Sequence, residues 1–123
     1  MKVGVFGSRD WESYPDIIRN LTLFIQNAHE LGHEGILFVH SGSRGAENMI
    51  TEYVGKTQKF LREKNFKLKE EVLRRESQIL RDMAVMESGL DFALVFSTGC
   101  KRTGACQRIL TEYQIPYETI EKA

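Results

Sequence analysis

The chain has 123 residues, of which 41% are hydrophobic, and its 17 Lys and Arg residues balance 17 Asp and Glu residues. This length predicts one domain over residues 1–123, because it leaves no room for two independent cores. The zero net charge argues against a dedicated duplex-DNA binder and makes nucleic acid an unlikely partner. No apolar run approaches the length of a membrane span, and the apolar N-terminal run is too short for a signal-peptide core. We therefore expect a cytoplasmic protein without membrane contact.

Apolar runs alternate with amphipathic patterns along the chain. Buried strands are predicted at residues 2–6, 35–40 and 91–96, and a weaker alternating pattern predicts another strand at 65–69. A last strand is predicted at 115–120, where Pro116 suits a strand start or a sheet edge. Helices are predicted at residues 14–31, from residue 46 onward, at 70–88 and at 105–113. Strands and helices in this order imply parallel βαβ units. The sequence thus predicts an α/β fold, a Rossmann-like three-layer sandwich with a mostly parallel five-stranded sheet and helices on both faces.

Local signals mark the ends and weak points of these helices. Ser13 can cap the first helix, and Gly32 fits as its C-terminal stop. Gly55 weakens the second helix, where a kink or irregular turn is expected. The third helix carries many charges, which predicts a solvated face with pairs such as Glu71 with Arg75.

Three polar loops follow predicted strands, at residues 7–10, 41–47 and 97–104. In open α/β sheets, ligands bind outside the carboxyl ends of the strands, near the point where the strand order reverses. Because all three loops follow strand C-termini, we expect them to converge on one edge of the sheet and to form one site.

The loop at residues 41–47 has the composition of an anion cradle. Gly42 and Gly45 permit a tight turn and close approach of the backbone to a ligand, and Arg44 adds a planar cation. The following helix offers free N–H groups and the positive end of its dipole to a phosphate. The alternative is an ordinary strand-to-helix turn. The full set of predicted ligand-binding residues is Gly7, Ser8, Arg9, Ser41, Gly42, Ser43, Arg44, Gly45, Glu47, Arg102, Thr103 and Gly104.

Two charged residues each allow two interpretations, and the neighbours of a third suggest its place. Arg9 either binds a ligand anion or pairs with Asp10 or Glu12 at the surface, a contact of about 0–1 kcal/mol. Glu47 either interacts with the dipole of its own helix, or accepts hydrogen bonds from a ribose or acts as a general acid or base. Arg81 lies beside apolar residues and is expected at the margin of the core.

The cysteines and histidines give weak signals. Cys100 and Cys106 match no common zinc or redox spacing, so a reduced, structural role is the default. Cys106 is the candidate for a thiol of low pKa near a helix N-terminus, although no base partner is identifiable. His29, His33 and His40 make a poor metal set. We expect neither a metal ion nor a cofactor.

Three motifs of this chain resemble the SLOG superfamily, most closely its YspA/YpsA-like small proteins of bacteria and phages. They are Gly-Ser-Arg-Asp-Trp at 7–11, Ser-Gly-Ser-Arg-Gly-Ala-Glu at 41–47 and Arg-Asp-Met at 81–83. The resemblance covers nearly the whole chain. It implies a Rossmann-like fold that binds nucleotides or nucleotide-derived ligands, and a homodimer or higher homo-oligomer. Relatives include cytokinin-activating phosphoribohydrolases, DNA-processing protein A and sensor domains of antiphage systems.

The chain also departs from the family pattern. The second motif is one residue shorter than usual and ends in Glu47, and Asp82 stands where the family usually has Asn. Thr103-Gly104 has the reverse of the usual order. The phosphoribohydrolase relatives have a catalytic Glu three residues beyond that pair, where this chain has Gln107, which cannot ionise. These departures favour binding over hydrolysis.

Three functions follow as hypotheses. The first is binding of a nucleotide or nucleotide-derived signal, as a sensor or sequestering protein of bacterial or phage origin. The second is N-glycosidic hydrolysis of a nucleoside monophosphate, with Glu47 and Arg81 as catalytic residues. The third is a single-stranded DNA-binding accessory role, against which the neutral charge and the lack of an aromatic stacking run both argue.

Overall fold

A computed structural model describes residues 1–122. Five strands alternate with four helices along the chain. The elements are β1 Lys2–Gly7, α1 Tyr14–Glu30, β2 Gly35–His40, α2 Ala46–Glu63, β3 Lys67–Val72, α3 Gln78–Met86, β4 Phe92–Ser97, α4 Lys101–Glu112 and β5 Tyr117–Glu121. Within the described residues, no helix is both long and apolar enough to span a bilayer.

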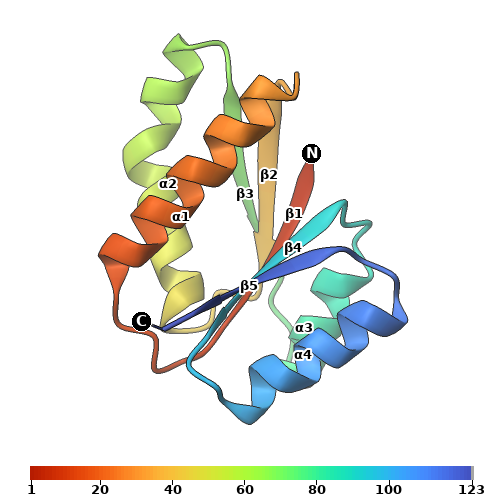
Figure 1. Cartoon of the computed structure of the whole chain (residues 1–123). Helices are drawn as coiled ribbons and strands as arrows, with labels where there is room; N and C mark the ends of the chain where they lie inside the picture. The colour runs from red at the N-terminus through yellow and green to blue at the C-terminus, as the bar shows by residue number, and fades with distance from the viewer. Residues whose placement is uncertain (123) are drawn as a thin grey trace.

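The strands form one sheet in the order β3-β2-β1-β4-β5, and every neighbouring pair is parallel. Helices α1 and α2 cover one face, and α3 and α4 cover the other (Figure 1). The predicted α/β, Rossmann-like three-layer fold is therefore confirmed. The sheet is wholly parallel, which is more uniform than the mostly parallel sheet that the sequence predicts.

Two apolar cores hold the layers together. The larger core joins the sheet to α1 and α2 and contains Trp11, whose ring packs edge-on against Phe96 with centroids 5.4 Å apart. The smaller core joins the sheet to α3 and α4 and contains Val85, Met86 and Leu110. The central strands are buried on both faces, as expected for a parallel sheet covered by helices.

Helix α1 begins and ends as its sequence predicts. The hydroxyl of Ser13 accepts a hydrogen bond from the backbone N–H of Asp16, at 3.3 Å. This bond satisfies one of the N–H groups that a helix start leaves free. Gly32 follows the helix with a φ of +93°, which is the left-handed conformation of a glycine stop. Gly55 causes no interruption, because α2 runs without a break from Ala46 to Glu63.

The prediction for residues 65–88 is partly wrong. The strand lies at Lys67–Val72 instead of 65–69, and the helix is confined to Gln78–Met86 instead of 70–88. Residues 70–72 are helix-compatible by composition, but they pair with the end of β2, so tertiary pairing overrides local propensity. Glu71 is consequently on a strand, and the expected helical pair of Glu71 with Arg75 does not exist.

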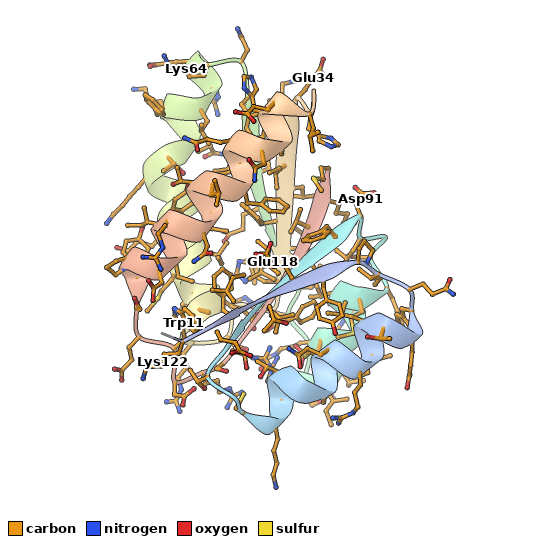
Figure 2. The ribbon with its side chains drawn as sticks, viewed as in Figure 1. Trp11, Glu34, Lys64, Asp91, Glu118 and Lys122 are labelled. Carbon is orange, nitrogen blue, oxygen red and sulfur yellow. The ribbon has the colours of Figure 1, made fainter. Side chains whose placement is uncertain are left out.

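The order of the strands reverses at β1. The chain passes from β1 to β2 and β3 on one side, then crosses to β4 on the other side. The loops after β1 and β4 therefore flank the crevice where such sheets bind ligands. Figure 2 shows Trp11 and Lys122 at this carboxyl end of the sheet, whereas Glu34, Lys64 and Asp91 lie toward the opposite end.

Candidate functional site

Glu47 lies in the first turn of α2 and is fully buried. Its Oε1 accepts hydrogen bonds from the backbone N–H and the hydroxyl of Ser41, at 2.9 and 2.6 Å. Its Oε2 accepts from Arg102, at 2.6 Å, and more weakly from the N–H of Gly7, at 3.4 Å. A carboxylate has about four acceptor positions, and these donors occupy them. Glu47 thus ties the ends of β1 and β2 to α4.

Arg102 lies in the first turn of α4 and connects two carboxylates. Its Nε and Nη2 donate to the two oxygens of Asp82 at 3.1 and 2.9 Å, while Nη2 also donates to Glu47. Nη1 donates to the carbonyl of Gly7. A guanidinium has five N–H donors, so one N–H of Nη1 is left after these contacts. This donor is what Arg102 can offer a ligand.

The buried charges of this network favour the ionised guanidinium. Burial alone would lower the pKa of Arg102, but the hydrogen bond and charge of Asp82, together with those of Glu47, raise it above its ordinary value. The two carboxylates exceed the one guanidinium by a single negative charge. Arg102 is therefore already compensated, and a bound phosphate would draw little net attraction from it.

Gln78, the first residue of α3, links the loops after β1 and β2. Its Oε1 accepts from the hydroxyl of Ser43 at 2.6 Å and from Arg9 at 3.2 Å. Its Nε2 donates to Ser41 at 3.1 Å and to Asp82 at 2.9 Å. A single amide thus fixes side chains from the loops after β1 and β2. Sequence reasoning missed Gln78, because the helix prediction for 70–88 placed this residue inside a solvated helix.

Ser8 joins the loop after β1 to the loop after β4. Its hydroxyl accepts from the N–H of Thr98 at 3.0 Å and lies 3.1 Å from the sulfur of Cys100. Thr98 in turn donates its hydroxyl to Asp10, at 2.7 Å. Because both loops are held by these bonds, the crevice at the strand reversal has a defined shape.

A cavity of about 570 Å³ opens over this crevice, lined by Arg9, Asp10, Arg44, Cys100 and Arg102. Arg9 and Arg44 are exposed, and within residues 1–122 neither forms an ion pair. The alternative pairing of Arg9 with Asp10 or Glu12 is thus absent from the described residues. Two exposed cations without an ion-pair partner there therefore stand beside a buried network that carries one net negative charge, and Asp10 adds a carboxylate to the lining. Another hollow, of about 420 Å³, lies at the amino end of the sheet and contains none of the predicted residues.

Gly45 serves packing between loops. Its φ is +86°, and a Cβ at this position would lie 2.4 Å from the carbonyl oxygen of Ser8 and 2.8 Å from that of Arg9. A Cβ on Gly7 would lie 2.4 Å from the Cβ of Ala46. These glycines bring the start of α2 against the loop after β1, and this contact places Arg9 beside Arg44.

The two cysteines lie in different surroundings. Cys100 is the N-cap residue of α4 and lines the cavity, whereas Cys106 is buried one turn and a half further along the helix. Partial burial raises the pKa of Cys100, but hydrogen bonds from Ser8, Thr103 and the backbone N–H groups of Thr103 and Arg102 outweigh it and lower the pKa below its ordinary value. Burial, followed by the charge of Asp82, raises the pKa of Cys106 to about 12. The thiol of low pKa is therefore Cys100, at the start of α4, and not the candidate Cys106, whose burial fits the structural role that the sequence favours by default.

We expect iodoacetamide to modify Cys100 in the folded protein and to leave Cys106 unmodified until the chain unfolds. The thiolate is the reactive form, and the lowered pKa of Cys100 places its labelling at lower pH than that of an ordinary thiol. Mass spectrometry of peptides labelled between pH 6 and pH 9 measures this. Cys100→Ser is expected to abolish labelling of the native protein, and labelling of Cys106 at equal rate would contradict the assignment.

The remaining predicted residues divide into two groups. Thr103 is buried and its hydroxyl lies 2.8 Å from that of Ser97, while Gly104 lies in the first turn of α4. Arg81 is half-buried, and its Nε donates to the backbone carbonyl of Arg75 at 2.8 Å. Arg81 therefore stands apart from the cavity, whereas the three loops meet there. Sequence reasoning missed Cys100 as a site residue, although its position inside the predicted loop at 97–104, two residues before Arg102, could have indicated it.

His40 supports the loop after β2 from below. Its Nδ1 accepts from the N–H of Gly42 at 3.0 Å, and its Nε2 lies 2.7 Å from Glu70. The accepting Nδ1 implies that the proton is on Nε2 and that Nε2 donates to Glu70. His40 is thus occupied by backbone and carboxylate partners, and the part of the chain that the structure describes contains no cluster of three metal-ligating side chains.

No protein-family model matches this chain, and searches of curated proteins and of solved structures gave no match either. The likeness to the SLOG superfamily consequently rests on the three motifs at 7–11, 41–47 and 81–83 and stays a hypothesis.

Proposed function

We propose that this protein binds a nucleotide or nucleotide-derived ligand in the cavity at the strand reversal, with the phosphate beside Arg9 and Arg44. The observation that carries the proposal is a pair of exposed arginines that have no ion-pair partner within residues 1–122 and that line a cavity of about 570 Å³. Arginine presents a planar fork of donors that matches phosphate oxygens. A volume of this size accommodates a small ligand.

The surrounding backbone adds to this charge. Helices α2 and α4 both begin at the cavity, so the positive ends of two helix dipoles point toward the same region. The remaining N–H on Nη1 of Arg102 can donate one more hydrogen bond, although the charge of this guanidinium is already compensated by its carboxylate partners. An anion would thus find two exposed guanidinium groups and a fixed set of dipoles, which is the arrangement of many phosphate sites.

The motif resemblance gives the proposal its ligand class. A sensor or sequestering role in bacteria or phages, and assembly as a homodimer or higher oligomer, come with that resemblance. A cytoplasmic location suits this role, and both cysteines are free thiols. Light scattering at two protein concentrations tests the assembly, and a mass of one chain at both would contradict it.

Calorimetric titration with a panel of nucleotides, cyclic dinucleotides and ADP-ribose derivatives tests the binding itself. We expect Arg44→Ala to weaken binding by roughly 10–100-fold, because a charge-assisted hydrogen bond contributes about 1.5–3 kcal/mol. Arg62→Ala is the matched control, since Arg62 is exposed in the last turn of α2, at the helix end opposite Arg44. Equal effects of the two substitutions, or no binding by any panel member, would contradict the proposal.

The hydrolase alternative has weaker support. The oxygens of Glu47 already accept from Ser41, Gly7 and Arg102, which leaves little capacity for a ribose hydroxyl or for proton transfer. Arg81 donates to a backbone carbonyl. Incubation with nucleoside monophosphates and chromatography for free base tests this alternative. Release of base by the wild type, lost in Glu47→Gln with unfolding temperature unchanged, would restore it.

A further inference from the structure

A second cavity lies between α3 and α4, beside the first. Its volume is about 280 Å³, and its walls include the apolar side chains of Ile79, Met83, Ala105 and Ile109. Pockets that take a whole small ligand usually measure about 300–1,000 Å³, so this cleft has room for one ring system rather than for a complete nucleotide. We call it the α3–α4 cleft.

Arg102 lines both cavities. Its guanidinium is held by Asp82 and Glu47, so the loop cavity and the α3–α4 cleft both border the same fixed planar group. Gln78 completes the partition, since it contacts Arg9 of the loop cavity and also lines the cleft. The two cavities are thus neighbours with opposite character, one cationic and one apolar.

The polar groups at the inner end of the cleft are already satisfied. Asp82 accepts from Arg102 and Gln78, and the thiol of Cys106 points at its Oδ2 from 3.7 Å. Because the one donor left over is an N–H on Nη1 of Arg102, the cleft selects a ligand mainly by apolar contact and by shape. A flat, weakly polar ring meets this requirement, and a phosphate or a free sugar does not.

We propose that the α3–α4 cleft is the base subsite for the nucleotide of the proposed function, with the ribose passing over Arg102 and the phosphate in the loop cavity. The inference rests on that proposed function and specifies it, because it assigns the ligand to the class of nucleoside monophosphates and their derivatives. Purines bind more tightly than pyrimidines, since a larger ring system buries more apolar surface against Ile79 and Met83. Discrimination between adenine and guanine is small, because the cleft offers a base only one free donor, the remaining N–H of Arg102.

The test compares nucleoside 5′-monophosphates with ribose 5-phosphate, which carries the phosphate and sugar but no base. The wild type is expected to bind the best monophosphate roughly tenfold or more tightly than ribose 5-phosphate. Ala105→Phe fills the cleft and is expected to reduce this ratio to about one, while the affinity for ribose 5-phosphate stays within about threefold. Ala84→Phe is the matched control, because Ala84 lies on the same helix and lines a different hollow but not the cleft.

Ile109→Ala is a second variant, which removes part of the apolar wall without filling the cleft. This variant is expected to lower the affinity for the monophosphate several-fold and to leave the affinity for ribose 5-phosphate unchanged. Thermal unfolding verifies that each variant is folded. An unchanged ratio in both variants overturns the base subsite and leaves the loop cavity as a phosphate site. If Ala105→Phe instead dissociates a dimer while the ratio stays constant, a second copy of the chain occupies the cleft and the inference also fails. Failure of the wild type to bind any of these probes overturns the proposed function itself.

Discussion

Arg102→Met is expected to lower the free energy of unfolding by about 3–5 kcal/mol, because it leaves two buried carboxylates without their cation. The side chains of Glu47 and Asp82 are only 1% and 10% exposed, so water cannot replace the guanidinium. Methionine keeps the apolar stem of arginine and nearly its volume. The loss therefore comes from unpaired charge and unmade hydrogen bonds, with little from a cavity.

Urea unfolding followed by tryptophan fluorescence measures this loss, since the single Trp11 packs in the larger core. Arg108→Met is the control on the same helix, because Arg108 is exposed and outside the network, and a change within about 0.5 kcal/mol is expected. The loss of stability in Arg102→Lys is expected to lie between the losses in Arg102→Met and Arg108→Met. An ammonium keeps the charge but not the planar fork that meets both carboxylates. A loss below about 1 kcal/mol in Arg102→Met would show that the carboxylates are not held as a buried ionic network.

The order of the elements could be predicted because the chain marks it locally. Apolar runs define β1, β2 and β4, while Ser13 and Gly32 define the ends of α1. Residues 67–72 lack such a marker, since the sequence Lys-Leu-Lys-Glu-Glu-Val suits a charged helix as well as an edge strand. Pairing with β2 decides between them, together with Glu70, whose carboxylate lies 2.7 Å from buried His40. That information lies in contacts between segments, which no local pattern contains.

The site shows the same division between local and tertiary information. The convergence of the three loops follows from parallel topology alone, so the sequence predicts where the residues gather. The sequence does not predict which arginine has its charge compensated by carboxylates. Arg102 is compensated because Glu47 and Asp82 lie beside it, and these two residues belong to two other helices. The sequence does not predict which of the two thiols has the lower pKa, for a related reason. A helix that begins at Lys101 instead of Ala105 turns Cys106 into the core and puts Cys100 at the cavity.

Gly45→Ala is expected to lower the free energy of unfolding by roughly 2–6 kcal/mol, from backbone strain and overpacking together. A φ of +86° with a ψ of −134° is a conformation that residues with a Cβ rarely adopt. The added methyl carbon would also lie 2.4 and 2.8 Å from two backbone carbonyl oxygens, those of Ser8 and Arg9, which have no rotamer to change. The loop after β1 must therefore move away from α2.

The same movement is expected to weaken ligand binding, because it separates Arg9 from Arg44 while both side chains stay intact. Denaturant unfolding measures the stability, and titration well below the unfolding temperature measures binding by the folded fraction. Gly55→Ala is the matched control in α2, since a Cβ there meets nothing within 4 Å, and a gain of about 0.4–1 kcal/mol is expected. If Gly45→Ala proves as stable as Gly55→Ala, the loops are not packed as tightly as these distances require. If it loses stability but binds as the wild type does, the spacing of the two arginines is not what holds the ligand.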